Sequence, residues 1–152
     1  MFSSIAFVGI LFYIALIDFK AQRIPDILTL SLYGLGVVSL FFNPSLYDKL
    51  LGGGVLFAFF LLLYLAKPQG VGFGDVKLAG AIGLFLGWKL ALLALFLAFT
   101  SGGLVGAILI LTKKKTLKDS LPFGPFLSGG AVIALFFGKQ VLDWYVNLLY
   151  FP

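Results

Sequence analysis

The chain has 152 residues, of which 61% are hydrophobic, and its eleven basic and six acidic residues give a net charge of +5. Soluble domains are about 45–50% apolar, so the composition indicates a membrane protein with a single domain over residues 1–152. The chain contains no cysteine and no histidine, which excludes disulfides, thiolate metal sites, a cysteine nucleophile and Ser-His-Asp catalysis. Carboxylates remain as the main acid/base groups, and we expect no metal or other cofactor.

Six apolar stretches follow one another along the chain, at residues 2–17, 27–42, 50–66, 76–88, 90–111 and 123–138. A straight transmembrane helix needs roughly 20 residues. The first, second and sixth stretches are near the short limit, and the fourth is clearly below it. The first stretch lacks a basic start and ends in Asp-Phe-Lys, so we interpret it as a retained span and not as a cleavable signal peptide.

Residues 139–152 mix aromatic and polar side chains, a composition typical of an interfacial helix or cap. The glycine-rich turn at 70–74 comes directly before the short fourth stretch. We expect residues 70–75 to dip into the membrane, buried by protein. The predicted fold is therefore all-α, with about six transmembrane helices, a short fourth helix and an interfacial C-terminal segment.

Loop charges predict the orientation of these spans. If the N-terminus is outside, the loops at 18–26, 67–75 and 112–120 face the cytoplasm. That face then carries eight basic residues, against three on the other: Lys20, Arg23, Lys67, Lys77, Lys113, Lys114, Lys115 and Lys118 against Lys49, Lys89 and Lys139. The positive-inside rule favours this orientation. The scattered basic residues fit a membrane topology better than a nucleic-acid surface, so we expect lipid around the chain and no nucleic-acid partner.

Glycines within the spans predict tight helix packing. Gly83 and Gly87, and likewise Gly102 and Gly106, have the spacing that lets two helix backbones approach closely. The turn at 70–74 is different, because an ionisable residue follows it directly. We expect that turn to shape a functional site.

Two aspartates mark the candidate site. Asp18 closes the first apolar stretch, and Asp75 closes the turn Gly72-Phe73-Gly74-Asp75. An ionisable residue at the edge of a membrane span is costly to bury, so each aspartate is a functional-site hypothesis. Alternatively, each caps a helix: Asp75 suits an N-cap, whereas Asp18 is badly placed at a helix C-terminus.

Two carboxylates in one site cannot both ionise easily, so one keeps a proton while the other stays charged. The charged group can deprotonate a water molecule, and the protonated group can polarise a peptide carbonyl. This chemistry hydrolyses an amide without metal, histidine or cysteine. Structural or ion-pathway roles for the two aspartates remain open at this point.

Three motifs place the aspartates in a wider pattern. They are Gly-Phe-Gly-Asp-Val-Lys-Leu at 72–78, Ile-Pro-Asp-Ile-Leu-Thr at 24–29 after Asp18, and Pro-Phe-Gly-Pro-Phe-Leu at 122–127. The first contains the GxGD signature of intramembrane aspartyl proteases. In their order and six-span layout, the motifs resemble the bacterial type IV prepilin peptidase family over nearly the whole chain.

The resemblance implies that Asp18 and Asp75 are the catalytic pair. It also implies a group of residues that shape the site: Gly72, Gly74, Lys77, Pro122 and Gly124. Lys77 either holds the charge of Asp75 or reaches toward lipid headgroups. Asp26 is a rival for the position of Asp18, but it follows Pro25, where we expect it to be a helix N-cap.

The function implied by the resemblance is removal of the short basic leader from prepilin or pseudopilin partners, at the cytoplasmic face of the bacterial inner membrane. Bifunctional members of the family carry an extra N-terminal region with cysteine motifs, linked to N-methylation. This chain begins almost at the first catalytic span and has no cysteine, so we expect a peptidase-only form or else a peptidase half in isolation.

Two other functions compete with this one. The first is a small transporter or proton- or ion-conducting protein that uses intramembrane carboxylates. The position of both aspartates at one face argues against it. The second is a packing or assembly subunit, which predicts that both aspartates can become asparagine without loss of function.

Overall fold

The structure is a computed structural model that describes residues 2–42, 45–67, 70–114, 116 and 121–150. These residues form six helices and no strand: α1 (Phe2–Ala21), α2 (Asp26–Phe42), α3 (Leu46–Ala66), α4 (Phe73–Leu86), α5 (Trp88–Leu111) and α6 (Gly124–Tyr150). The predicted all-α fold is confirmed. Lys115 and Lys118, counted among the loop charges above, lie outside the described residues.

Four of these helices are long and apolar enough to cross a membrane, namely α1, α3, α5 and α6. The chain is therefore a polytopic membrane protein. The apolar part of α2, Asp26–Phe41, is shorter, and α4 has only 14 residues. The prediction of a short fourth helix is confirmed.

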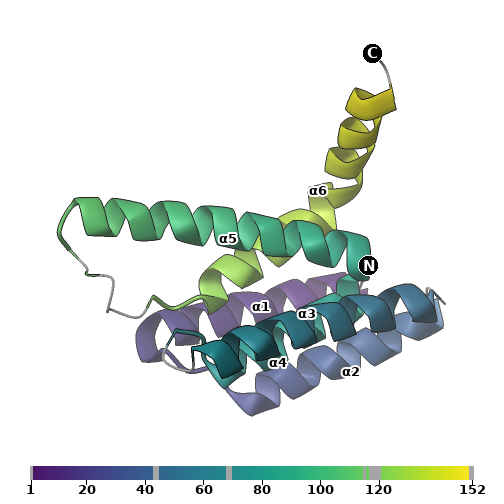
Figure 1. The fold of residues 1–152 in the computed structure, drawn as a ribbon. Helices are drawn as coiled ribbons and strands as arrows, with labels where there is room; N and C mark the ends of the chain where they lie inside the picture. Colours follow the sequence, from purple (N-terminus) through teal and green to yellow (C-terminus); the bar gives the residue numbers. More distant parts are fainter. Residues whose placement is uncertain (1, 43–44, 68–69, 115, 117–120, 151–152) are drawn as a thin grey trace.

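The C-terminal segment is helical, and its interfacial position stays a prediction. Residues 139–150 continue α6 and do not form a separate element. Gly138 lies inside the helix, and neither glycine nor proline occurs from residue 139 to 151, so nothing in the sequence stops the helix. The last part of α6, drawn in yellow, turns away from the other helices (Figure 1).

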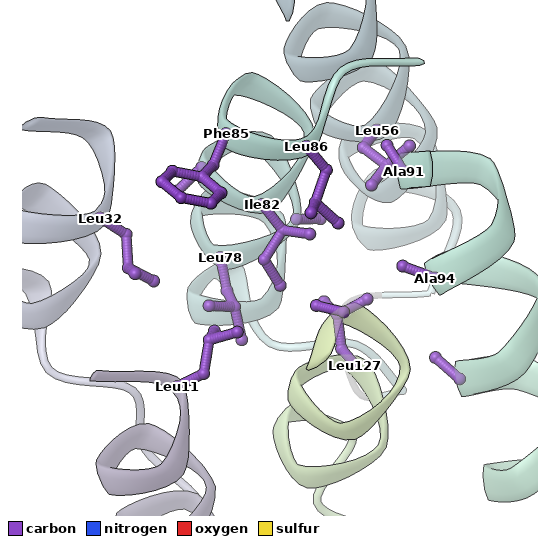
Figure 2. Packing of buried hydrophobic residues seen from close by; sticks show 14 of the residues in the cluster. Leu11, Leu32, Leu56, Leu78, Ile82, Phe85, Leu86, Ala91, Ala94 and Leu127 are labelled. Atoms are coloured by element: carbon purple, nitrogen blue, oxygen red, sulfur yellow. The ribbon is translucent and has the colours of Figure 1, made fainter. Parts of the chain in front are cut away.

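The short helix α4 lies at the centre of the molecule and packs against α2, α3, α5 and α6. Its apolar side chains meet leucines of four other helices, as Figure 2 shows for Leu78, Ile82, Phe85 and Leu86 beside Leu11, Leu32, Leu56 and Leu127. The ring of Phe7 on α1 stacks on that of Phe85, with centroids 3.9 Å apart. Because protein surrounds α4, it can be too short to span a bilayer by itself.

The backbones of α3 and α4 touch through glycines. A Cβ atom added to Gly52 would lie 2.6 Å from the carbonyl oxygen of Gly83, and one on Gly53 would lie 3.2 Å from that of Gly80. Such contact matches the close packing that small residues permit between membrane helices. Gly87, with φ of 80°, then turns the chain from α4 into α5.

The helices place two groups of connections at opposite ends of the molecule. At one end, toward the left of Figure 1, the C-termini of α1 and α3 meet the N-termini of α2, α4 and α6. We call this the site end; it contains Asp18, Asp75 and Gly124. The far end contains Ser39, Lys49 and the turn at Gly87.

Candidate active site

A cavity of about 320 Å³ opens at the site end and gathers several residues that the sequence singled out. It lies between the end of α1, the connection to α2 and the first turn of α4. Three aspartates line it together with two cations, and the full lining is Asp18, Gln22, Arg23, Ile24, Asp26, Gly72, Phe73, Gly74, Asp75 and Lys77. The two predicted catalytic residues thus share one cavity, which we call the site cavity.

Asp18 is buried in the last turn of α1. The helix ends because Gln22 adopts a left-handed conformation (φ of 50°), and its N–H donates to the Asp18 carbonyl at 2.9 Å. The Asp18 side chain accepts a hydrogen bond on Oδ2 from the N–H of Gly124, also at 2.9 Å. A Cβ atom on Gly124 would lie 2.6 Å from this oxygen, so the absence of a side chain there permits the contact.

Asp75 is buried in the first turn of α4, and its position corrects the expected N-cap. The N-cap residue is Gly72, and Asp75 is the third residue of the helix. Its Oδ2 reaches back to accept the N–H of Gly72 at 3.1 Å, which is one half of a capping box. A Cβ atom on Gly74 would lie 3.0 Å from the side chain of Ile24, so this glycine lets the α1–α2 connection approach Asp75.

The second oxygen of the Asp75 carboxyl group, Oδ1, is buried and has no hydrogen-bond partner among the residues that the structure describes. A buried polar atom without a partner is costly. The helix that carries Asp75, α4, is not one of the four helices long enough to span a membrane. Burial, and then the negative charge of Asp18, raise the pKa of Asp75 from 3.8 to about 6, against the opposing hydrogen bond from Gly72. Oδ1 is thus suited to carry a proton.

Lys77 pairs with Asp26 and not with Asp75 among the described residues, and its predicted reach toward lipid headgroups stays a prediction. Its Nζ donates to Oδ1 of Asp26 at 2.7 Å and lies 5.1 Å from the centre of the Phe73 ring. Residues two apart on a helix do not face each other, and the Lys77 side chain reaches Asp26 while both Lys77 and Asp75 line the site cavity. The ion pair joins α4 to α2 at the edge of the site cavity.

Asp26 is the first residue of α2 and not its N-cap, which corrects a second capping prediction. The carbonyl of Pro25 accepts hydrogen bonds from the N–H groups of Leu28 and Thr29. Pro25 therefore holds the position where the helix begins, and the Asp26 side chain is left to pair with Lys77.

The remaining residues divide into those at the cavity and those away from it. Pro122 lies in the segment before α6 and is not part of the cavity lining, whereas its neighbour Gly124 touches Asp18. Gln22 and Arg23 also line the cavity, and neither was predicted as a site residue. Gln22 is not one of the residue types, Asn, Asp and His, that are enriched among left-handed non-glycine residues, so its conformation could not have been predicted from its type.

Together these features place two buried carboxyl groups in one cavity, each with one oxygen held by a backbone N–H group from a distant or preceding turn. The charge of each disfavours ionisation of the other, so the pair can share one proton. An arrangement of this kind can activate a water molecule with one carboxylate and donate a proton from the other.

Comparison with known proteins identifies the family. The model of the type IV leader peptidase family matches residues 5–107. The chain is 29% identical over 150 residues to the prepilin leader peptidase/N-methyltransferase of Bacillus subtilis, covering 97% of this chain and 60% of that protein. Proteins of the same description in Legionella pneumophila and Pseudomonas aeruginosa are each 31% identical, over 92% and 88% of this chain and 51% and 48% of their own lengths.

The chain therefore spans about half the length of the curated relatives that it matches. No solved structure matches it significantly. The family model covers more than half of the chain and includes both aspartates of the site cavity. The chain belongs to the type IV leader peptidase family.

Proposed function

We propose that the protein is a membrane aspartyl endopeptidase that removes the short basic leader from prepilin or pseudopilin substrates. The observation that carries this proposal is the meeting of Asp18 and Asp75 in one cavity of a chain that belongs to a leader peptidase family. The names of the relatives, which include prepilin leader peptidase, support the substrate class.

In the proposed mechanism Asp75 is the proton donor and Asp18 is the base. Asp75 holds a proton on Oδ1, the oxygen that has no partner among the described residues, and polarises the carbonyl of the peptide bond to be cut. Asp18 stays charged, with Oδ2 fixed by the N–H of Gly124, and deprotonates the attacking water. Collapse of the tetrahedral intermediate breaks the C–N bond, and the proton taken by Asp18 passes to the leaving amine.

The proposed location is the bacterial inner membrane, with the site cavity facing the cytoplasm. The excess of loop lysines and arginine at the site end supports this orientation. A test uses the lack of native cysteine. Lys20→Cys, at the exposed end of α1, should react with an impermeant thiol reagent from the cytoplasmic side only. Lys89→Cys, exposed at the start of α5, should react from the other side, and the reverse pattern would contradict the orientation.

The function is tested by incubating the purified protein in detergent with a prepilin-like substrate and identifying the products by mass spectrometry. Wild type should cut between the leader and the hydrophobic helix. Asp18→Asn and Asp75→Asn should each lower the rate by about 10²–10⁴-fold, whereas Asp26→Asn should retain the catalytic step. The assignment of the pair would be refuted if Asp18→Asn or Asp75→Asn cleaved at the full rate, or if cleavage were lost only in Asp26→Asn.

A further inference from the structure

The three aspartates of the site cavity differ in their access to water. Asp18 is 5% exposed and Asp75 8%, whereas the side chain of Asp26 is 77% exposed. Asp26 lies at the N-terminus of α2, on the rim of the same cavity. Its position allows it to meet a substrate side chain before the peptide bond reaches the buried pair.

The other charges on the rim are positive. Arg23 lies on the α1–α2 connection, and Lys77 lies on α4. A substrate with a basic leader is repelled by both of these side chains. Of the aspartates that line the cavity, Asp26 is the exposed one, so it is the carboxylate that a cationic leader side chain can reach.

From these positions we infer that Asp26 binds a Lys or Arg side chain of the substrate's leader by exchanging its partner Lys77 for the substrate cation. The inference rests on the proposed function, because it assigns a specificity-determining residue to the same cavity. Asp26 does not touch the reacting atoms in this account. It holds the leader so that the bond to be cut lies over Asp18 and Asp75.

The present ion pair can be exchanged at little cost. The Asp26 side chain is exposed and that of Lys77 is half-buried, and an ion pair that water can reach is weak because water competes for its partners. Lys77 also keeps a second favourable contact when Asp26 leaves it, since its Nζ lies over the face of the Phe73 ring. Lys77 thereby serves as a placeholder for the substrate cation.

A purely structural role for the pair makes a different prediction. If the Asp26–Lys77 contact only ties α2 to α4, then removing either partner has the same effect on every substrate. If Asp26 binds the leader, removing Lys77 frees the carboxylate and strengthens binding of a basic leader. The variant Lys77→Gln therefore separates the two roles.

The experiment measures kcat and KM for two matched substrates, one with a basic leader and one with its Lys and Arg residues changed to Gln. We expect Asp26→Asn to raise KM about tenfold for the basic leader only, the loss of one charge-assisted contact. Lys77→Gln should lower KM severalfold for the same substrate, with kcat unchanged in both variants. Asp143→Asn serves as the control and should behave as wild type. It also removes one negative charge, but in the C-terminal part of α6, outside the site cavity.

A charge reversal completes the test. Asp26→Lys should cut the basic leader poorly and should regain activity on a leader whose basic residues are changed to Glu. Equal losses on both leaders, or a raised KM for the basic leader in Lys77→Gln, would overturn the inference and leave the peptidase function standing. Failure of wild type to cut either leader would overturn the peptidase function and this inference together.

Discussion

The two ends of the helix bundle both bury charged side chains, but they treat them differently. At the far end Lys49 is 5% exposed, and its Nζ donates to Oγ of Ser39, which donates in turn to the carbonyl of Gly36. At the site end Asp75 is buried to a similar degree, yet its Oδ1 lacks a partner among the described residues. The Lys49 ammonium group donates to a protein hydroxyl, whereas the Asp75 side chain lines a cavity.

This difference is the one expected between a structural charge and the acid/base group that we propose. A buried charge with partners ties neighbouring helices together, here α2 and α3 through Ser39 and Lys49. A buried carboxyl group that keeps one oxygen free is poised to exchange a proton or to bind a substrate atom. The rarity of ionisable residues in membrane helices marks both ends as notable, and their hydrogen bonds and the site cavity distinguish them.

The largest expected effect tests the difference between Asp75 at the site end and Lys49 at the far end. Asp75→Asn should lower the rate of leader cleavage by about 10²–10⁴-fold and leave the protein folded, because the amide fits the same space. Lys49→Met should change the cleavage rate by no more than about twofold, far less than the removal of an acid/base group. The reason is that Lys49 does not line the site cavity. Parallel rate assays and thermal unfolding in detergent check both variants. A severe loss of rate in folded Lys49→Met would show that the far end takes part in the chemistry.

The next effect concerns the glycine contact that positions α4. Gly52→Ala should destabilise the protein by about 1–3 kcal/mol, because the added methyl overpacks the backbone of α4 at Gly83 and Gly87. Gly54→Ala is the matched control, since no atom lies within 4 Å of its added Cβ. Thermal unfolding in detergent measures both. Equal stability of the two variants would contradict the close approach of α3 and α4.

The raised pKa of Asp75 predicts how the rate depends on pH. Because the value lies near 6 instead of 3.8, the protonated acid persists up to about pH 6 and is lost as the pH rises further. A mechanism with Asp75 as proton donor should therefore slow by about tenfold per pH unit well above pH 6. Measuring kcat from pH 5 to 9, with helical circular dichroism as a check of folding, tests this. A rate that rises from pH 6 to 8 would assign the opposite role to Asp75.

A smaller effect is expected where α6 touches Asp18. Gly124→Ala should lower kcat by about tenfold, or about 1.4 kcal/mol, because the new methyl displaces the Asp18 carboxylate from the N–H of residue 124. Gly129→Ala lies on the same helix with open space around its added Cβ and should behave as wild type. If kcat of both variants equals that of wild type, the prediction is wrong.

The helical fold was predictable because apolar runs separated by short charged segments leave few alternatives in a membrane. The short length of α4 was also predictable, since Gly72 and Gly74 precede a run too short to span. The burial of Lys49 was not: its side chain was assigned to an outside loop, but α3 begins at Leu46 and carries it inward. Nothing in the local sequence indicates that Ser39 would accept a hydrogen bond from the Lys49 ammonium group.

The candidate pair itself was predictable from motifs, while the contacts that orient it were not. Asp18 and the N–H of Gly124 are 106 positions apart, and Asp26 and Lys77 are 51 apart. Such contacts depend on how helices pack, which a single sequence does not encode locally. Neither aspartate is the N-cap of its helix, because Gly72 and Pro25 hold those positions. Asp75 instead caps from the third position through the N–H of Gly72, and Asp26 pairs with Lys77.

The most direct test of the account is a double-variant cycle on the pair of aspartates, with leader cleavage measured for Asp18→Asn, Asp75→Asn and the double variant. If the two carboxyl groups act as one unit, the double variant should lose no more rate than either single variant, because removing one partner already disables the other. Losses that multiply, or a single variant that keeps the wild-type rate, would contradict a shared site.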